Sequence, residues 1–292
     1  MTFWTDLLGQ EFRVDRVDVG GVATRVLRTG AGESIIFLHG ISGHLETFIP
    51  CIRFYGGVYA LHLLDMLGHG WTDKVGGALT IDRLSDHVIA YMDSQGISQA
   101  HLVGLSLGGW TAGWMAAHHA DRVLTTTLVA AAGNLAMGRP EFGEGVRSST
   151  SAGVLSDDRE NTRKRLQRVI HKTELLSEEL VDVRFTIYQM PAFRRELDGL
   201  LALTWPETYA KYALTPDVLG KITGEVLVVW GEDDDRSGVA DGNFLVDHIA
   251  KSKIVQMDGT GHWPPYERPA DFVALHTALM RHGLGAIAGG RC

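Results

Sequence analysis

Residues 100–113, AHLVGLSLGGWTAG, decide how this chain folds. The apolar run AHLVGL predicts a buried strand, and the Ala- and Gly-rich segment after it predicts a helix. Between them, Gly104, Ser106 and Gly108 form a G-x-S-x-G pattern, which is typical of a serine on a sharp strand-to-helix turn. The chain can pass itself at such a turn only if the positions two before and two after the serine lack side chains. The pattern therefore predicts that the Ser106 hydroxyl is a nucleophile standing above a sheet, at the N-terminus of a helix.

Short apolar strands alternate with helical segments along most of the chain. Residues 12–19 and 22–28 alternate apolar and polar side chains around a Gly-Gly turn, which predicts a β-hairpin. Further apolar runs, typical of strands buried on both faces, occur at 34–38, 58–65, 122–132, 225–230 and 253–257. Together they predict an α/β fold with a mostly parallel, eight-stranded sheet covered by helices on both faces.

The alternation is interrupted once. From about residue 134 to about residue 214 there is no buried-strand pattern, and charged helical segments take its place. We therefore expect an α/β core formed by residues 1–133 and 215–284, with a helical cap inserted at 134–214. The Gly-rich residues 285–292 are expected to form a flexible tail.

Composition narrows the range of partners. The chain has 292 residues, and its 35 acidic and 27 basic side chains give a formal net charge of −8, which argues against nucleic-acid binding. No apolar run is long enough for a transmembrane helix, and the N-terminus lacks the features of a signal peptide. Two cysteines, and 13 histidines without a zinc-ligand motif, give no support for a disulfide framework or a metal site. We expect a soluble cytoplasmic protein that acts on a small molecule without metal or cofactor; a homo-oligomer is compatible with the sequence.

An anion formed by attack of Ser106 on a carbonyl needs two backbone N–H donors nearby. The first is the N–H of Leu107, at the start of the predicted helix. We assign the second to Ile41, in the Gly-rich loop that ends the strand at 34–38, and treat the Ser42 hydroxyl as a candidate substrate contact. His39, which precedes the turn of this loop, is expected to be structural.

His262 is the candidate general base, because it lies in a Gly-rich loop, GTGHWP, after the last predicted strand. Its acid partner is expected where the strand at 225–230 runs into Gly231-Glu-Asp-Asp-Asp235. The chain order Ser, Asp, His is satisfied by any of these acids; we prefer Asp234, with Asp233 and Asp235 as alternatives. The other position where such an acid could stand, after the strand at 122–132, holds Gly133 and Asn134.

These motifs together resemble those of the α/β-hydrolase superfamily, over nearly the whole chain. The matching stretches are His39-Gly40, the run at 65–70, the turn around Ser106, the W-G-x-x-D run at 230–234 and Gly261-His262-Trp263. The resemblance implies a Ser-His-Asp triad whose acid lies three residues after the glycine of W-G-x-x-D, which is Asp234. It also implies a helical cap between strands six and seven.

The predicted cap contains an arginine on an apolar helix face. Leu180, Val183, Ile187 and Met190 recur at helical spacing, and Arg184 falls among them. A buried guanidinium is unfavourable unless it is paired, so Arg184 should meet either a protein carboxylate or a substrate carboxylate.

The second alternative resembles the meta-cleavage-product hydrolases, which cleave a carbon–carbon bond in 2-hydroxy-6-oxo-hexadienoates. Arg184 in an E-E-L-x-x-x-R setting and Trp263 after the candidate base match that family, and the resemblance implies that both contact substrate. The chain departs from it at Ile41-Ser42-Gly43-His44, at Leu105 before the serine and at Gly68-His69-Gly70. A carboxylesterase or lactonase therefore stays open, and a hydrolase-fold binding protein without catalysis is a remote alternative. Ser106 disfavours a haloalkane dehalogenase, since enzymes that resemble those have an aspartate there.

Overall fold

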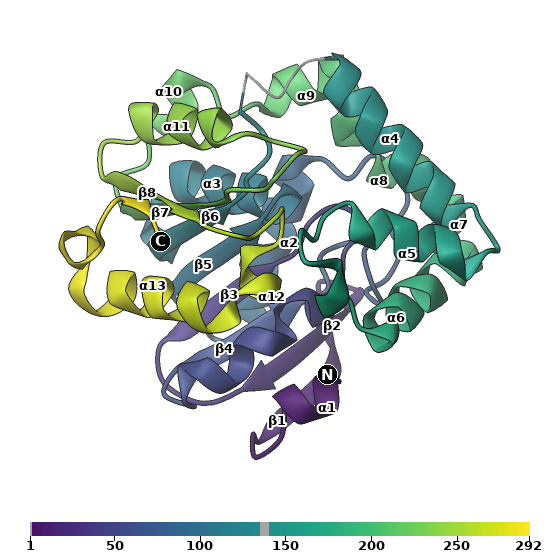
Figure 1. The fold of residues 1–292 in the computed structure, drawn as a ribbon, viewed down its shortest axis with the longest axis horizontal. Helices are drawn as coiled ribbons and strands as arrows, with labels where there is room; N and C mark the ends of the chain where they lie inside the picture. The colour runs from purple at the N-terminus through teal and green to yellow at the C-terminus, as the bar shows by residue number, and fades with distance from the viewer. Residues whose placement is uncertain (1, 135–139) are drawn as a thin grey trace.

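The computed structural model describes residues 2–134 and 140–292, and within these ranges the strands form one nine-stranded sheet (Figure 1). The order across the sheet is β1-β2-β4-β3-β5-β6-β7-β8-β9; β1, β2 and β4 pair antiparallel and all other neighbours pair parallel. The strands are β1 (Phe12–Val19), β2 (Val22–Thr29), β3 (Ser34–Leu38), β4 (Ala60–Leu64), β5 (Ala100–Leu105), β6 (Val123–Val129), β7 (Glu225–Gly231), β8 (Ser252–Met257) and β9 (Gly290–Arg291). The predicted α/β fold with a mostly parallel sheet is confirmed.

The ninth strand comes from the segment that we expected to be a flexible tail. Residues Leu284–Ala286 form a 3₁₀ turn (η6), and β9 then pairs parallel with β8. The backbone N–H of Cys292 donates to the carbonyl of Gln256 at 3.0 Å. Because the chain end is hydrogen-bonded to the edge of the sheet, residues 290–292 continue the core instead of trailing from it.

Helices cover both faces of the sheet, as the buried strands require. One face carries α2 (Ile81–Ser94), α3 (Leu107–His118) and α11 (Val239–His248). The other carries α13 (Pro269–His282) and the long 3₁₀ segment η1 (Leu45–Tyr55), which contact each other. The central strands accordingly contribute almost fully buried side chains, such as Ile36, Val103 and Val228. Within the described ranges, no helix is long and apolar enough to cross a membrane.

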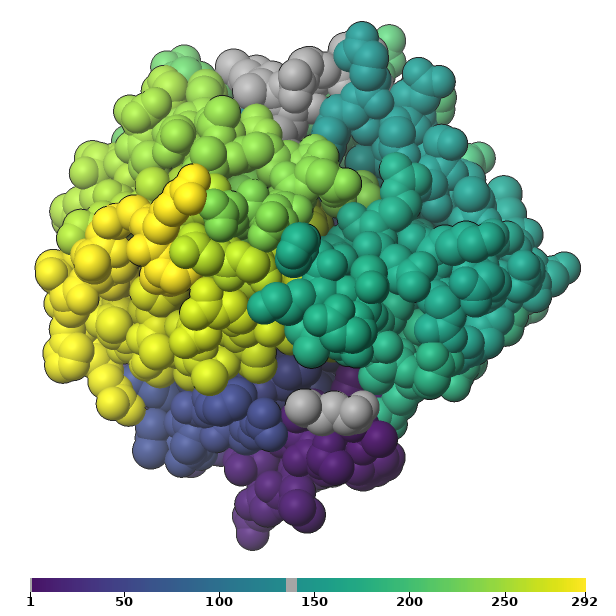
Figure 2. Space-filling model, viewed as in Figure 1, coloured from purple at the N-terminus to yellow at the C-terminus, as the bar shows by residue number. Residues whose placement is uncertain are grey.

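A layer of helices lies over one end of the sheet, at the right of Figure 1. It is made of α4 (Pro140–Val154), α5 (Arg159–Gln167), α6 (Glu178–Gln189), α7 (Pro191–Arg195), α8 (Leu197–Leu200) and α9 (Pro206–Tyr212). Asn134 and Leu214 form an isolated parallel bridge, so the chain enters and leaves this layer at adjacent points. The space-filling view shows the teal cap helices packed against the yellow-green C-terminal core (Figure 2). Residues 135–139 of the cap expected at 134–214 lie outside the described ranges.

The loops that carry the candidate site all leave the same edge of the sheet. The strands β3, β5, β7 and β8 are parallel, so their carboxyl ends lie together. The loops after them hold Ile41, Ser106, Asp234 and His262 respectively. In open α/β sheets this edge is where ligands bind.

Candidate active site

Ser106 lies between β5 and α3 with a strained backbone. Its φ of 56° and ψ of −112° lie in a region that side-chain-bearing residues rarely adopt. A Cβ added at Gly104 would lie 2.2 Å from the carbonyl oxygen of Gly108, and one added at Gly108 would lie 2.0 Å from that of Leu38. The steric reason for the two glycines, expected from the sequence, is therefore present in the structure.

The serine faces a cavity between the core and the cap. Its lining includes Ser106 and His262 from the core, together with the apolar side chains Trp110, Phe142, Val146, Leu166, Leu203 and Trp263. Gly40 is packed so closely that a Cβ there would lie 3.3 Å from the Cβ of Ser106. Largely apolar walls around a few polar groups are typical of a site for a small organic ligand.

His262 is held by contacts on two sides. Its Nδ1 lies 2.7 Å from Oδ2 of Asp234, and its backbone N–H donates to the carbonyl of Val169, in the cap, at 3.0 Å. A bond from Nδ1–H to a carboxylate leaves Nε2 as the proton acceptor. His262 and Ser106 line the same cavity, so the structure brings serine, histidine and aspartate to one place.

Of the three neighbouring aspartates, Asp234 is the one that meets His262. Its side chain is fully buried and also accepts hydrogen bonds from the Ser237 hydroxyl, at 2.8 Å, and from the backbone N–H of Arg236, at 3.0 Å. Burial alone would raise the pKa of this carboxyl, but His262 and these donors lower it below its usual value, which keeps it ionised. Asp233 and Asp235 are exposed and lie outside this contact.

The expected oxyanion donors also lie at the cavity. Leu107 is the first residue of α3, so its N–H has no acceptor within the helix, and Ile41 lies in the loop that passes Ser106. Ser42 does not line this cavity in the described residues. Its hydroxyl is buried, 3.0 Å from the hydroxyl of Tyr188 and 3.1 Å from Nη2 of Arg165.

Arg184 lies at the cavity, and none of the carboxylates in residues 2–134 and 140–292 pairs with it. Its side chain is 2% exposed and makes no ion pair with any described residue. Nη1 donates to the Tyr188 hydroxyl at 3.3 Å, whereas Nε and Nη2 have no hydrogen-bond partner in the described part of the chain. The ring of Trp263 lies 5.8 Å from the guanidinium carbon. The sequence left two partners open for Arg184, a protein carboxylate and a substrate carboxylate. Within the described residues, no protein carboxylate contacts it.

Three further polar residues near Arg184 were not predicted from the sequence. Arg165 and Arg236 line the cavity, and Tyr188 is buried behind it. The Tyr188 hydroxyl accepts hydrogen bonds from Arg184 and from Nε of Arg165, the latter at 3.2 Å. Burial would raise the pKa of Tyr188, but the two guanidinium groups and Ser42 lower it to about 8. Its spacing of four residues from Arg184 on one helix was the signal that could have identified Tyr188.

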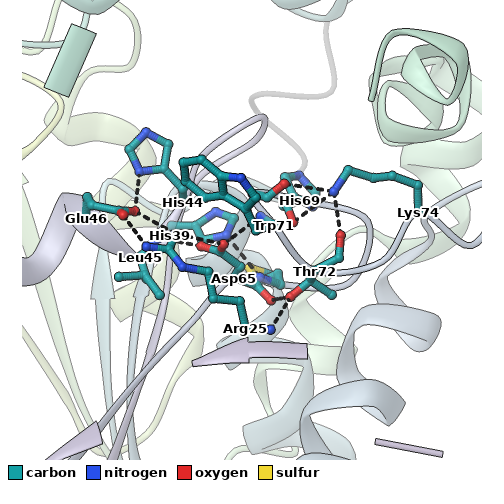
Figure 3. A network of polar contacts seen from close by, with 12 residues as sticks. Arg25, His39, His44, Leu45, Glu46, Asp65, His69, Trp71, Thr72 and Lys74 are labelled. Atoms are coloured by element: carbon teal, nitrogen blue, oxygen red, sulfur yellow. Dashed lines mark hydrogen bonds and ion pairs between the residues drawn. The ribbon is translucent and has the colours of Figure 1, made fainter. Parts of the chain in front are cut away.

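A second polar network, shown in Figure 3, supports the loops beneath the site. Arg25 on β2 pairs with Glu46 and with Asp65, whose carboxylate also accepts from the N–H groups of Leu45 and Trp71 at 2.8 Å each. Glu46 in turn lies 2.8 Å from Nδ1 of His44. The network therefore connects the loop after β3 to the loop after β4.

His39 belongs to the same support. Its Nδ1 bonds to the carbonyl of Gly40 at 2.8 Å, and its Nε2 accepts the N–H of Met66 at 3.1 Å. Burial lowers the pKa of His39 well below its usual value, so the ring is neutral. No group of three or more His, Cys, Asp or Glu side chains in the described part of the chain is arranged to hold a metal ion.

The fold and this site define a class: an enzyme in which a serine on a strand-to-helix elbow faces a cavity beside a histidine–aspartate pair. The chain belongs to the alpha/beta hydrolase fold family, whose profile matches residues 33–269. It is therefore an α/β hydrolase.

The chain is similar to several characterised proteins. It is 30% identical, over 91% of its length and 67% of the relative's, to the dihydrolipoyllysine-residue acetyltransferase component of the acetoin cleaving system of Cupriavidus necator. It is 26% identical, over 88% of its length and 87% of the relative's, to a 2-hydroxy-6-oxo-6-(2'-aminophenyl)hexa-2,4-dienoic acid hydrolase of Metapseudomonas resinovorans. Among solved structures, 2-hydroxy-6-oxo-6-phenylhexa-2,4-dienoate hydrolase from a Rhodococcus strain superposes with a TM-score of 0.81, at 21% identity, over 94% of this chain and 99% of that one. The last similarity concerns the fold alone.

Proposed function

We propose that this α/β hydrolase cleaves a carbon–carbon bond in a 2-hydroxy-6-oxo-dienoate, through Ser106, His262 and Asp234. The observation that carries the proposal is Arg184: a buried guanidinium at the cavity that holds the serine, with two nitrogens that meet no hydrogen-bond partner among the residues the structure describes. A planar carboxylate can accept two hydrogen bonds from such a group. The relatives named as dienoic acid hydrolases support the same substrate class.

The reaction follows from these groups. Arg184 holds the substrate carboxylate, which directs the distant 6-oxo carbonyl toward Ser106. His262 takes the serine proton as Oγ attacks that carbonyl, and the N–H groups of Leu107 and Ile41 stabilise the resulting oxyanion. The dienol must first convert to its keto tautomer, with the 2-hydroxyl proton moved to C5, so that breaking the C5–C6 bond leaves an electron pair delocalised onto the C2 oxygen. Protonated His262 then returns its proton to this dienolate leaving group. Water, activated by the same ring, then hydrolyses the acyl ester on Ser106.

Asp234 keeps His262 in the tautomer that this sequence of proton transfers requires, and it stabilises the imidazolium. Neither step needs a metal or a cofactor. In line with the composition, we place the reaction in the cytoplasm.

A carboxylesterase or lactonase is the second candidate, and one observation favours it. Leu105, which precedes the serine, is fully buried, and the Ser42 hydroxyl is bonded to Tyr188 and Arg165. Neither position therefore offers the dienoate a free polar contact, whereas the serine and the oxyanion donors serve an ester equally well.

The deciding experiment compares kcat/KM for chromogenic 2-hydroxy-6-oxo-dienoates and for neutral nitrophenyl esters, with the wild type and the Ser106→Ala and Arg184→Gln variants. We expect the dienoates to be preferred and Ser106→Ala to be inactive on both substrates. Arg184→Gln should lose about 10–100-fold on the dienoates and little on neutral esters, because a hydrogen bond to a charged group is worth roughly 1.5–3 kcal/mol. Efficient ester hydrolysis with no turnover of dienoates would refute the carbon–carbon reaction and support the esterase.

A further inference from the structure

Ser42 has a strained backbone conformation in the loop that follows β3. Its φ is 53°, in the left-handed region that residues with side chains rarely adopt. The backbone N–H of Gly43 donates to the carbonyl of Gly40 at 2.9 Å, so Ser42 is the third residue of a tight turn. Glycine is favoured at a turn position with positive φ, because it has no Cβ. A serine stays there only when its surroundings hold it.

The side chain of Ser42 faces the cap. Its neighbours Ile41 and Gly43 line the cavity, whereas Ser42 is not among the described residues that do. The Ser42 side chain is fully buried, and its oxygen lies 3.0 Å from the Tyr188 hydroxyl. The same oxygen accepts a hydrogen bond from Nη2 of Arg165 at 3.1 Å. Ser42 therefore joins a loop of the core to two helices of the cap, α5 and α6.

The hydrogen bonds of this contact have a defined direction. The Tyr188 oxygen accepts from Nη1 of Arg184 at 3.3 Å and from Nε of Arg165 at 3.2 Å, which uses both of its lone pairs. The Tyr188 proton is then left for the Ser42 oxygen. Arg165 is also bonded to the Ser149 hydroxyl on α4, at 2.8 Å. The cap thus holds Ser42 by two donors whose own positions are fixed by further contacts.

Ile41 lies between two fixed points of the loop. On one side, Gly40 packs against the nucleophile, since a Cβ added there would lie 3.3 Å from the Cβ of Ser106. On the other side, Ser42 is bonded to the cap. The Ile41 N–H has no acceptor in the described part of the chain, so the loop itself sets its direction. An oxyanion donor is effective when it is already aligned before the reaction begins.

We propose that Ser42 is a positioning residue for the oxyanion hole. Its contacts with the cap keep the strained turn in place, and the turn aims the Ile41 N–H at the anion. The inference rests on the proposed role of Ile41 and applies to an ester as much as to a dienoate. It replaces the substrate contact expected for Ser42 from the sequence. The two roles can be told apart, because a substrate contact depends on the hydroxyl alone, whereas positioning also depends on the backbone.

Two substitutions at Ser42 test this role with a neutral nitrophenyl ester. Ser42→Ala removes the hydroxyl but keeps a Cβ at positive φ, so the turn should relax and kcat should fall by about 10–100-fold, somewhat less than for loss of a whole oxyanion donor. Ser42→Gly adopts positive φ freely and should lose less than about tenfold. KM should change little in both, because the oxyanion forms only after attack. Ser252→Ala, which removes a hydrogen-bonded hydroxyl at the amino end of β8, should leave kcat unchanged.

A second measurement does not depend on the substrate that the enzyme turns over. A fluorophosphonate loses fluoride as the Ser106 oxygen bonds to phosphorus, and its phosphoryl oxygen needs the oxyanion donors. The labelling rate should therefore fall from the wild type to Ser42→Gly and further to Ser42→Ala. Tyr188→Phe removes a donor to Ser42, so it should slow labelling in the wild type but have little further effect in Ser42→Gly. Circular dichroism checks that each variant is folded.

Equal losses in Ser42→Ala and Ser42→Gly would overturn the positioning role, and so would unchanged kinetics in Ser42→Ala. If Ser42→Ala does not fold, the Tyr188→Phe comparison decides, and an equal effect in the wild type and in Ser42→Gly refutes the role. If dienoates are not turned over but the labelling order holds, the carbon–carbon reaction fails and the positioning role is supported. Absence of labelling in the wild type would overturn both.

Discussion

Replacing Arg25 with methionine should destabilise the protein more than any exposed ion pair could. The Arg25 side chain is 15% exposed, and its partners Glu46 and Asp65 are 6% and 0% exposed. Removing one member of a buried pair typically costs about 3–5 kcal/mol, because the remaining charge stays buried without compensation. Asp65 keeps two backbone donors and Glu46 keeps His44, so we expect a loss near the middle of that range, about 4 kcal/mol. At about 2–4 °C per kcal/mol for a domain of this size class, Tm should fall by about 8–16 °C.

The measurement is thermal and urea unfolding followed by circular dichroism, with Arg16→Met as the matched control. Arg16 pairs with Asp73, but both side chains are about half exposed, so the control should lose less than about 1 kcal/mol. A double variant, Arg25→Met with Glu46→Gln, should recover part of the loss because one unpaired charge is removed. Equal stability of the two single variants would show that the buried network does not stabilise the loops beneath the site.

Three further predictions concern the site. Asp234→Asn should lower kcat by roughly 10³–10⁴-fold with the fold intact, while Asp235→Asn, which changes an exposed side chain, should have little effect. Steady-state kinetics on both variants shows which aspartate is the partner of His262. Gly108→Ala should give little folded protein, because its Cβ would lie 2.0 Å from a carbonyl oxygen, whereas Gly145→Ala has open space around it and should fold normally. Soluble yield and circular dichroism measure both, and a normally folded Gly108→Ala variant would contradict the prediction. The pKa of Tyr188 is about 8, so raising the pH through this value should form a phenolate that competes with acidic substrates for Arg184 and Arg165, and KM should rise. The Tyr188→Phe variant should lack this alkaline rise in KM. Identical profiles of KM against pH in the two proteins would refute the competition.

The strand-to-helix turn and the order of the core were predictable from the sequence because each depends on local pattern. The apolar run expected at 34–38 is β3 (Ser34–Leu38), and the serine expected on a turn has a φ of 56°. Buried parallel strands need continuous apolar residues, and a tight turn needs glycines, so both can be recognised from local sequence patterns.

The remaining site residues have no such local sequence pattern. The segment that becomes α5 has a single apolar residue, Leu166, so no apolar stripe in its sequence separates Arg165, which faces the cavity, from Arg163, which pairs with Glu178 outside it. Likewise, three consecutive aspartates look alike until the turn folds. Backbone donors from Arg236 and Ser237 then draw the Asp234 side chain inward toward His262.

The short segment after α5 contacts the loop of His262 through its backbone. The Val169 carbonyl accepts the N–H of His262, and Glu267 binds the N–H of Lys172 through one carboxylate oxygen and the N–H of Gly261 through the other. The position of the imidazole therefore depends on this segment of the 134–214 insertion, which lies far from His262 in the sequence: a substitution that displaced Val169 would also remove a backbone hydrogen bond from the loop that holds the candidate base.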